Sequence, residues 1–239
     1  MMILHCYLYS RSWIEACETP AADVGGRRYI RMVITDVTED LEPLKLRVVP
    51  ASEVPFADVE AVFGTRGDPA HCWCQWYKIP GTDWRRFGDE GLRDLLQEQV
   101  HASGIGRGLL AYDGETPVGW CAVEPRSDLP RLSRSTIVKG GTAHPDFDDD
   151  AVWAVSCFVV PRNHRGRGVA RALAEAAVDF ARAGGAVVVE AYAVDPKIRA
   201  KVSADALFHG TVSMFTHAGF TEIARPRPDR AIMQVELGR

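Results

Sequence analysis

The sequence lacks the features that mark several large classes of protein. No run approaches the ~20 apolar residues that a membrane-spanning helix needs. The opening "MMILHCYLYSRSW" has neither the basic start nor the small-residue cleavage site of a signal peptide. The formal net charge is −4, whereas nucleic-acid-binding domains are usually basic. We therefore expect a cytoplasmic protein with neither a membrane nor a nucleic acid as its partner.

Clear signatures of a metal site or a disulfide framework are also missing. In a chain of 239 residues with ample apolar material and no signal sequence, we expect reduced thiols. The stretch "HCWCQW", His71 to Trp76, resembles half of a zinc site, but no CxxC or HxxxH pair supplies the other ligands. No metal is expected. The six cysteines are Cys6, Cys17, Cys72, Cys74, Cys121 and Cys157.

The chain divides into an extension and one domain. Residues 1–43 are turn-rich and acidic without sustained periodicity, so we expect an N-terminal extension, partly irregular, followed by a domain over 44–239. Within the domain the patterns predict the order β, α, α, β, β, β, α, β, α, β, β. The strands are expected at 44–49, in a hairpin around Asp113–Thr116, and at 151–160, 186–195, 220–226 and 231–238; the helices at 52–64, 90–101, 169–184 and 210–219.

The strand–helix–strand unit over 152–194 should be a right-handed parallel crossover. The neighbouring strands look antiparallel. The pattern therefore predicts an α/β (α+β) fold with a mixed sheet.

The stretch "PRNHRGRGVARALAEAAVDFARAGG" (161–185) places cations and glycines directly at a helix start. The first turn of a helix presents unpaired N–H groups and a partial positive charge. Gly166 and Gly168 let the backbone approach a ligand, and Arg165 and Arg167 add charge. This combination suits a pyrophosphate.

Two common phosphate-binding motifs do not fit this loop. A P-loop is excluded because the chain has no GxxxxGK[ST]. A dinucleotide fingerprint would need a small residue at the position of Arg171, and its glycines would follow the strand immediately.

The stretch "VVPRNHRGRGVARAL" instead resembles the acetyl-coenzyme A signature of the GCN5-related N-acetyltransferases (GNAT), R/Q-x-x-G-x-G/A, here Arg165-x-x-Gly168-x-Ala170. "HGTVSMFTHAGFTEIAR" resembles the second motif of that family. The resemblance implies a mostly antiparallel sheet of six to seven strands, splayed at its centre and with helices on both faces. It implies acetyl-CoA as co-substrate, bound by Phe158, Val159, Val160, Arg165, Gly166, Arg167, Gly168, Val169, Ala170, Arg171 and Phe215.

The acid and base of the reaction are less evident. Many members of the family carry a tyrosine where this chain has Phe215, and a glutamate near the position of Val152. A backbone N–H near Cys157 or Phe158 is the expected oxyanion donor. The candidates for acid and base are Tyr192, Glu190, Asp150 and Ser213.

The resemblance implies an N-acetyltransferase, most simply one that acts on a primary amine of a small molecule. "CWCQWY" (72–77) could form an aromatic wall of the acceptor pocket or a satellite core, and "DFDDD" (146–150) could attract a cationic amine or be solvated. Aminoglycoside-like, polyamine and amino-acid acceptors stay open, as does a homodimer. The alternatives are a protein N-terminal or lysine acetyltransferase, a non-catalytic acyl-CoA sensor and a nucleotide-binding regulator.

Overall fold

The computed structural model describes residues 45–64, 66–102, 106–198 and 204–238. They fall within one compact unit, Pro43–Arg239. The extension predicted over residues 1–43 lies outside the described residues.

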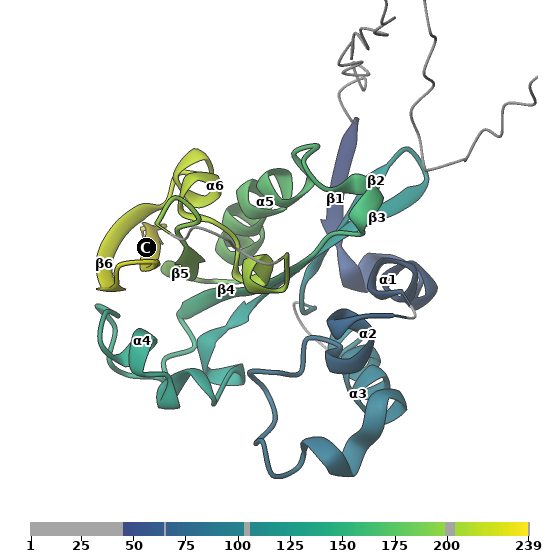
Figure 1. Cartoon of the computed structure of the whole chain (residues 1–239), viewed down its shortest axis with the longest axis horizontal. Helices are drawn as coiled ribbons and strands as arrows, with labels where there is room; N and C mark the ends of the chain where they lie inside the picture. Colours follow the sequence, from purple (N-terminus) through teal and green to yellow (C-terminus); the bar gives the residue numbers. More distant parts are fainter. Residues whose placement is uncertain (1–44, 65, 103–105, 199–203, 239) are drawn as a thin grey trace, which may run out of the picture. The chain divides into compact units, whose positions relative to one another are not determined.

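Seven strands form one sheet in the order β1-β2-β3-β4-β5-β7-β6 (Figure 1). All neighbouring strands pair antiparallel except β4 and β5, which are parallel. The mixed, mostly antiparallel sheet and the parallel pairing across the β4–α5–β5 unit confirm the predicted fold class. The strands are β1 (Leu46–Pro50), β2 (Leu109–Asp113), β3 (Thr116–Pro125), β4 (Val152–Val159), β5 (Val188–Val194), β6 (Thr221–Arg227) and β7 (Arg230–Glu236).

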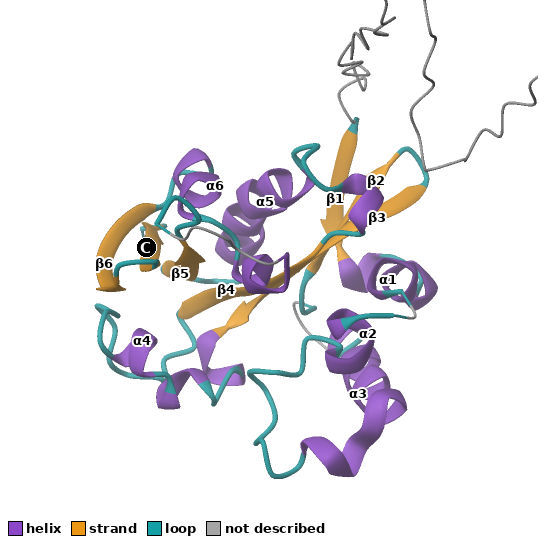
Figure 2. Cartoon of the chain, viewed as in Figure 1, coloured by secondary structure: helices purple, strands orange, loops and turns teal. Residues whose placement is uncertain are grey.

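Helices cover both faces of the sheet, as Figure 2 shows. On one face α5 and α6 pack in a core that includes Leu173 and Phe215. On the other face α1 and α3 contribute Val59 and Leu96 to a second core. The α-helices are α1 (Phe56–Phe63), α2 (Asp68–Cys72), α3 (Trp84–Val100), α4 (Thr136–Lys139), α5 (Val169–Ala183) and α6 (Val212–His217), and a 3-10 helix, η5 (Ala204–His209), precedes α6.

Several predicted boundaries are wrong, each for a local reason. The helix expected from residue 52 begins at Phe56, because Pro55 keeps the preceding Val54 extended. The helix expected from residue 90 begins at Trp84 and bends at Gly88, whose φ of 63° interrupts it. The sequence patterns missed α2 and α4, because helices of five and four residues are too short to show a periodicity.

The sheet separates between β4 and β5. These strands pair over only four positions, from Val152 with Val188 to Val155 with Ala191. Beyond them the edge of β4 that would face β5 has no strand partner among the described residues. The predicted central splay is therefore present. In the part of the chain that the structure describes, no helix is long and apolar enough to cross a membrane.

Candidate active site

A cavity of about 920 Å³ opens where β4 and β5 separate. Four segments line it: the free end of β4 from Ser156 to Val160, the loop and helix start over 164–171, the segment 68–84, and residues 207–214 around the start of α6. The cavity thus connects the cationic loop with the aromatic stretch, two features that lie about ninety residues apart in the sequence.

A β-bulge marks the point where the cavity begins. The pairing of β3 with β4 passes from Ala122–Cys157 directly to Val123–Val155, so Ser156 is left out of the ladder. A bulge turns backbone groups away from their regular direction and is common beside active sites. Ser156 and Cys157 both line the cavity, so the irregular part of β4 lies at its wall.

The loop before α5 has the backbone geometry of an anion site. Gly166 and Gly168 have φ values of 74° and 85°, which side chains other than glycine rarely adopt, and no atom lies within 4 Å of where a Cβ would stand at either position. The helix begins after Gly168, and Ala172 N–H bonds to the Gly168 carbonyl. The N–H groups of the first turn are therefore left for an external acceptor.

Arginine side chains reinforce this loop. Arg165 Nε donates to the Val160 carbonyl at 2.9 Å and so ties the loop to the end of β4. Arg171 faces the cavity and pairs loosely with Glu175 across 3.6 Å. Of the residues predicted to bind the donor, all but Arg167 and Phe215 line the cavity. Phe215 is fully buried in the core, where its ring lies 5.9 Å from that of Phe158.

The four residues predicted as acid or base lie elsewhere. Glu190 is fully buried, and its carboxylate pairs with Arg126 at 3.0 Å and accepts from the Tyr192 hydroxyl at 3.2 Å. Asp150 is exposed and accepts from the Ser127 hydroxyl. Ser213 is exposed on α6. None of the four is among the described residues that line the cavity, so their catalytic roles stay predictions. The acidic stretch 146–150 does not line it either.

Two titratable side chains from distant segments, Tyr77 and His209, meet in the cavity lining. Tyr77 Oη lies 3.3 Å from Nε2 of the buried His209. Burial raises the pKa of Tyr77 to about 12, while burial and the nearby charge of Arg230 lower the pKa of His209 to about 3. Both groups are therefore neutral near pH 7. Sequence reasoning missed them as a pair because 132 residues separate them.

Cys72 and Cys74, two of the cysteines that line the cavity, are poor nucleophiles. A hydrogen bond with Cys157 and burial raise the pKa of Cys74 well above its usual value. Burial also raises the pKa of Cys72 to about 12. Since the thiolate is the reactive form, these two thiols are unsuited to covalent catalysis. Among the described residues, no three His, Cys, Asp or Glu side chains are grouped as a metal site would require.

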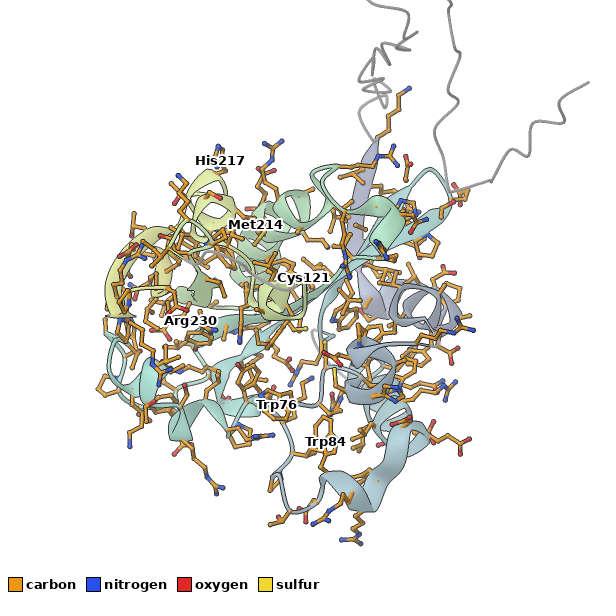
Figure 3. The ribbon with its side chains drawn as sticks, in the orientation of Figure 1. Trp76, Trp84, Cys121, Met214, His217 and Arg230 are labelled. Carbon is orange, nitrogen blue, oxygen red and sulfur yellow. The ribbon has the colours of Figure 1, made fainter. Side chains whose placement is uncertain are left out.

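The aromatic stretch divides between core and cavity. Trp73 is buried and stacks on Phe63 with ring centroids 5.0 Å apart, as a satellite core requires. Trp76 and Trp84 line the cavity instead, with ring centroids 5.8 Å apart, and Figure 3 shows them close together. The buried Lys78, paired with Glu124 at 2.8 Å, anchors the end of the stretch.

Comparison with known proteins agrees with this geometry. Residues 73–201, more than half of the chain, match the sequence model of the acetyltransferase (GNAT) family. No curated protein matches the sequence significantly.

Similar solved structures include three of low sequence identity. A GCN5-related N-acetyltransferase from Kribbella flavida is 20% identical, with 80% of this chain and 98% of that chain covered and a TM-score of 0.45. Ard1 from Thermoplasma volcanium is 11% identical, with 81% of this chain and 99% of that chain covered and a TM-score of 0.43. The putative acetyltransferase yncA from Salmonella typhimurium, solved with acetyl-CoA, is 16% identical (82% and 95% covered, TM-score 0.40). By its family match, the chain belongs to the GNAT family of acetyltransferases, which use acetyl-CoA as the acetyl donor.

Proposed function

We propose that this protein transfers the acetyl group of acetyl-CoA to a primary amine of a small molecule. The observation that carries the proposal is the shared cavity in which a glycine- and arginine-containing loop, a free strand edge and an aromatic segment meet. Acetyl-CoA, which has a pyrophosphate at one end and a thioester at the other, can occupy the loop and the strand edge. The aromatic segment is left for the acceptor.

The donor would lie along β4. The N–H groups at the start of α5, with Arg165 and Arg171, would bind the pyrophosphate through the helix dipole and direct charge. The edge of β4 at Phe158–Val160, beyond its pairing with β5, would hydrogen-bond the amides of the pantetheine arm, as an added strand does. The thioester would then reach the bulge at Ser156, next to the Tyr77–His209 pair.

The chemistry requires few groups. The neutral amine attacks the thioester carbonyl carbon and loses a proton to solvent, while a backbone N–H of β4 near Cys157 or Phe158 stabilises the oxyanion. The carbon–sulfur bond then breaks, and the leaving thiolate takes a proton. We propose that the Tyr77 hydroxyl supplies this proton and then regains one from solvent, since Tyr77 is protonated near pH 7 and lines the cavity. Holding amine and thioester together supplies much of the remaining rate enhancement.

The cavity lining outside the glycine loop and β4 favours a small molecule. It comes from two segments, with Cys72 and Trp84 in one and Phe208 in the other. A protein lysine or N-terminus would need an open groove along which a peptide could lie. A small amine needs only a pocket, such as the one between these segments.

A broad panel of amines with acetyl-CoA tests the proposal. Release of free thiol should depend on the amine, and mass spectrometry should show an amine heavier by one acetyl group. Acceptance of protein N-termini or lysines alone would favour the protein-modifying alternative. Tight acetyl-CoA binding without turnover of any amine would contradict catalysis and favour the sensor.

A further inference from the structure

We infer that the acceptor is a monoamine carried on a flat, apolar body such as an aromatic ring, and that Trp76 is the platform on which this body lies. The inference rests on the proposed function and narrows its acceptor from any small amine to one chemical class. The amine would project from the platform toward β4, where the thioester lies.

Two neighbouring side chains support Trp76, although nearly half of it is exposed. The Arg131 guanidinium lies 4.0 Å from the Trp76 ring centroid, and Arg131 Nη1 donates to the Trp76 carbonyl at 2.8 Å. The Trp84 ring meets the same indole edge to face. Even so, Trp76 is 48% exposed. A supported and exposed indole loses little conformational entropy when a ligand covers it, so it is well prepared to bind an apolar group.

The neighbours of Trp76 extend this apolar surface toward the reaction centre. The ring of Trp84 and the side chains of Leu207 and Phe208 also line the cavity. Tyr77 follows Trp76 directly in the chain, and its hydroxyl reaches His209 beside the β4 bulge. An amine joined to an aromatic body by a short aliphatic linker could therefore lie on Trp76 and present its nitrogen near Tyr77.

The charges around the platform disfavour acceptors with several positive charges. Among the described lining residues, Asp68 is the one carboxylate, and the cationic Arg165 and Arg171 belong to the donor end. Arg131 already lies over the Trp76 ring, so a second cation near that indole would meet its repulsion. Polyamines and aminoglycosides would find one carboxylate for several ammonium groups. A monoamine with an apolar body avoids this mismatch.

A steady-state comparison of acceptors tests the inference in the full chain with saturating acetyl-CoA. The panel contains 2-phenylethylamine and tryptamine, the aliphatic butylamine, the polycations spermidine and kanamycin, and a tripeptide with a free N-terminus. We expect kcat/KM to be at least about tenfold higher for the two aromatic monoamines than for the others. A higher value for spermidine, kanamycin or the peptide would overturn the inference but leave acetyl transfer intact. No turnover with any amine would overturn the proposed function as well.

Variants of Trp76 distinguish a role in acceptor binding from a purely structural role. Trp76→Ala should raise KM for tryptamine about tenfold, and Trp76→Phe, which keeps an aromatic ring, should restore most of the loss. Phe87→Ala removes an exposed aromatic side chain that does not line the cavity, and it should leave KM unchanged. An unchanged KM in Trp76→Ala, with thermal unfolding like that of the wild type, would overturn the inference. If Trp76→Ala does not fold, Trp84→Ala takes its place. An unchanged KM for tryptamine in a folded Trp84→Ala would then overturn the inference.

Arg131→Gln provides a second readout. Removing this charge should lower the preference for tryptamine over spermidine about tenfold, because the repulsion of polycations is lost along with part of the support for Trp76. An unaltered preference would contradict the electrostatic part of the argument.

Discussion

Tyr77 and His209 lie together in the cavity lining, and burial favours the neutral form of both. The phenol and the imidazole Nε2 lie 3.3 Å apart, and His209 also interacts with the backbone of Ser156. In many GNAT enzymes a helix residue donates the proton to the thiolate, but here that position is held by the buried Phe215. A hydroxyl from a different segment can perform the same task, with His209 as a positioning residue.

Tyr77→Phe is predicted to lower kcat by roughly a hundredfold, because the thiolate loses its proton donor. The KM for acetyl-CoA should stay the same, since Tyr77 does not contact the pyrophosphate loop in this account. Thiol release under steady-state conditions measures both constants.

Tyr192→Phe is the matched control for Tyr77→Phe. Its hydroxyl is buried against Glu190, away from the described lining of the cavity, so its kcat should stay near that of the wild type. The prediction from the sequence that Tyr192 is the acid requires the opposite result, with a slow Tyr192→Phe and a fast Tyr77→Phe.

Single site residues could be predicted from the sequence where they lie within one contiguous motif. Gly166 and Gly168 could be placed because glycine, arginine and a helix start lie within a few residues, and helix electrostatics then specify an anion. The pairing of Tyr77 with His209 could not be predicted, because it depends on how two distant loops pack. Glu190 and Tyr192 were correctly predicted to share one face of their strand, but the sequence does not show that Arg126 covers that face.

At the scale of elements, a buried ion pair joins the loop after β3 to β5. Arg126 contacts Glu190 and also donates to the carbonyls of His144 and Asp146, both at 2.6 Å. The Thr142 hydroxyl donates to the other carboxylate oxygen of Glu190 at 2.5 Å. The long polar segment between β3 and β4 is thus attached to the centre of the sheet through one carboxylate.

Glu190→Gln is predicted to lower the free energy of unfolding by about 3 kcal/mol, because the buried Arg126 charge loses its partner. Urea denaturation measures this change. Glu175→Gln breaks an exposed pair with Arg171 and should cost less than about 1 kcal/mol. If Glu190→Gln instead kept its stability and lost turnover, the carboxylate would act as a base, as the sequence suggested.

Element prediction succeeded where periodicity was long. The pattern over Val169–Ala183 spans four turns, and the strands at β4 and β5 are nearly continuous apolar runs. The separation of β4 from β5 was expected only through the family resemblance. The bulge at Ser156 was not expected, since it arises from the register between β3 and β4, which no single strand encodes.

At the scale of the whole molecule, the buried His209 makes the stability depend on pH. Its pKa is about 3 in the folded chain and near 6.5 when unfolded, so between these values the unfolded state binds the extra proton. Stability contributed by His209 is therefore present above pH 6.5 and is lost as the pH falls.

Between pH 7 and pH 5 the wild type is predicted to lose about 2 kcal/mol more unfolding free energy than His209→Gln, which cannot take up the proton. Urea denaturation of both proteins at the two pH values gives this difference directly. Equal losses in both would show that His209 does not titrate in this way.

In the proposed function, one cavity holds donor and acceptor together, with acetyl-CoA bound at its cationic end. Calorimetric titration of acetyl-CoA tests this binding, with Gly168→Asp and Gly185→Asp as a matched pair. The two glycines lie at opposite ends of α5, have φ values of 85° and 86°, and have no atom within 4 Å of where a Cβ would stand, so the strain of substitution is similar. We predict that the wild type and Gly185→Asp bind one acetyl-CoA and that Gly168→Asp does not. Equal binding by all three proteins would contradict the account.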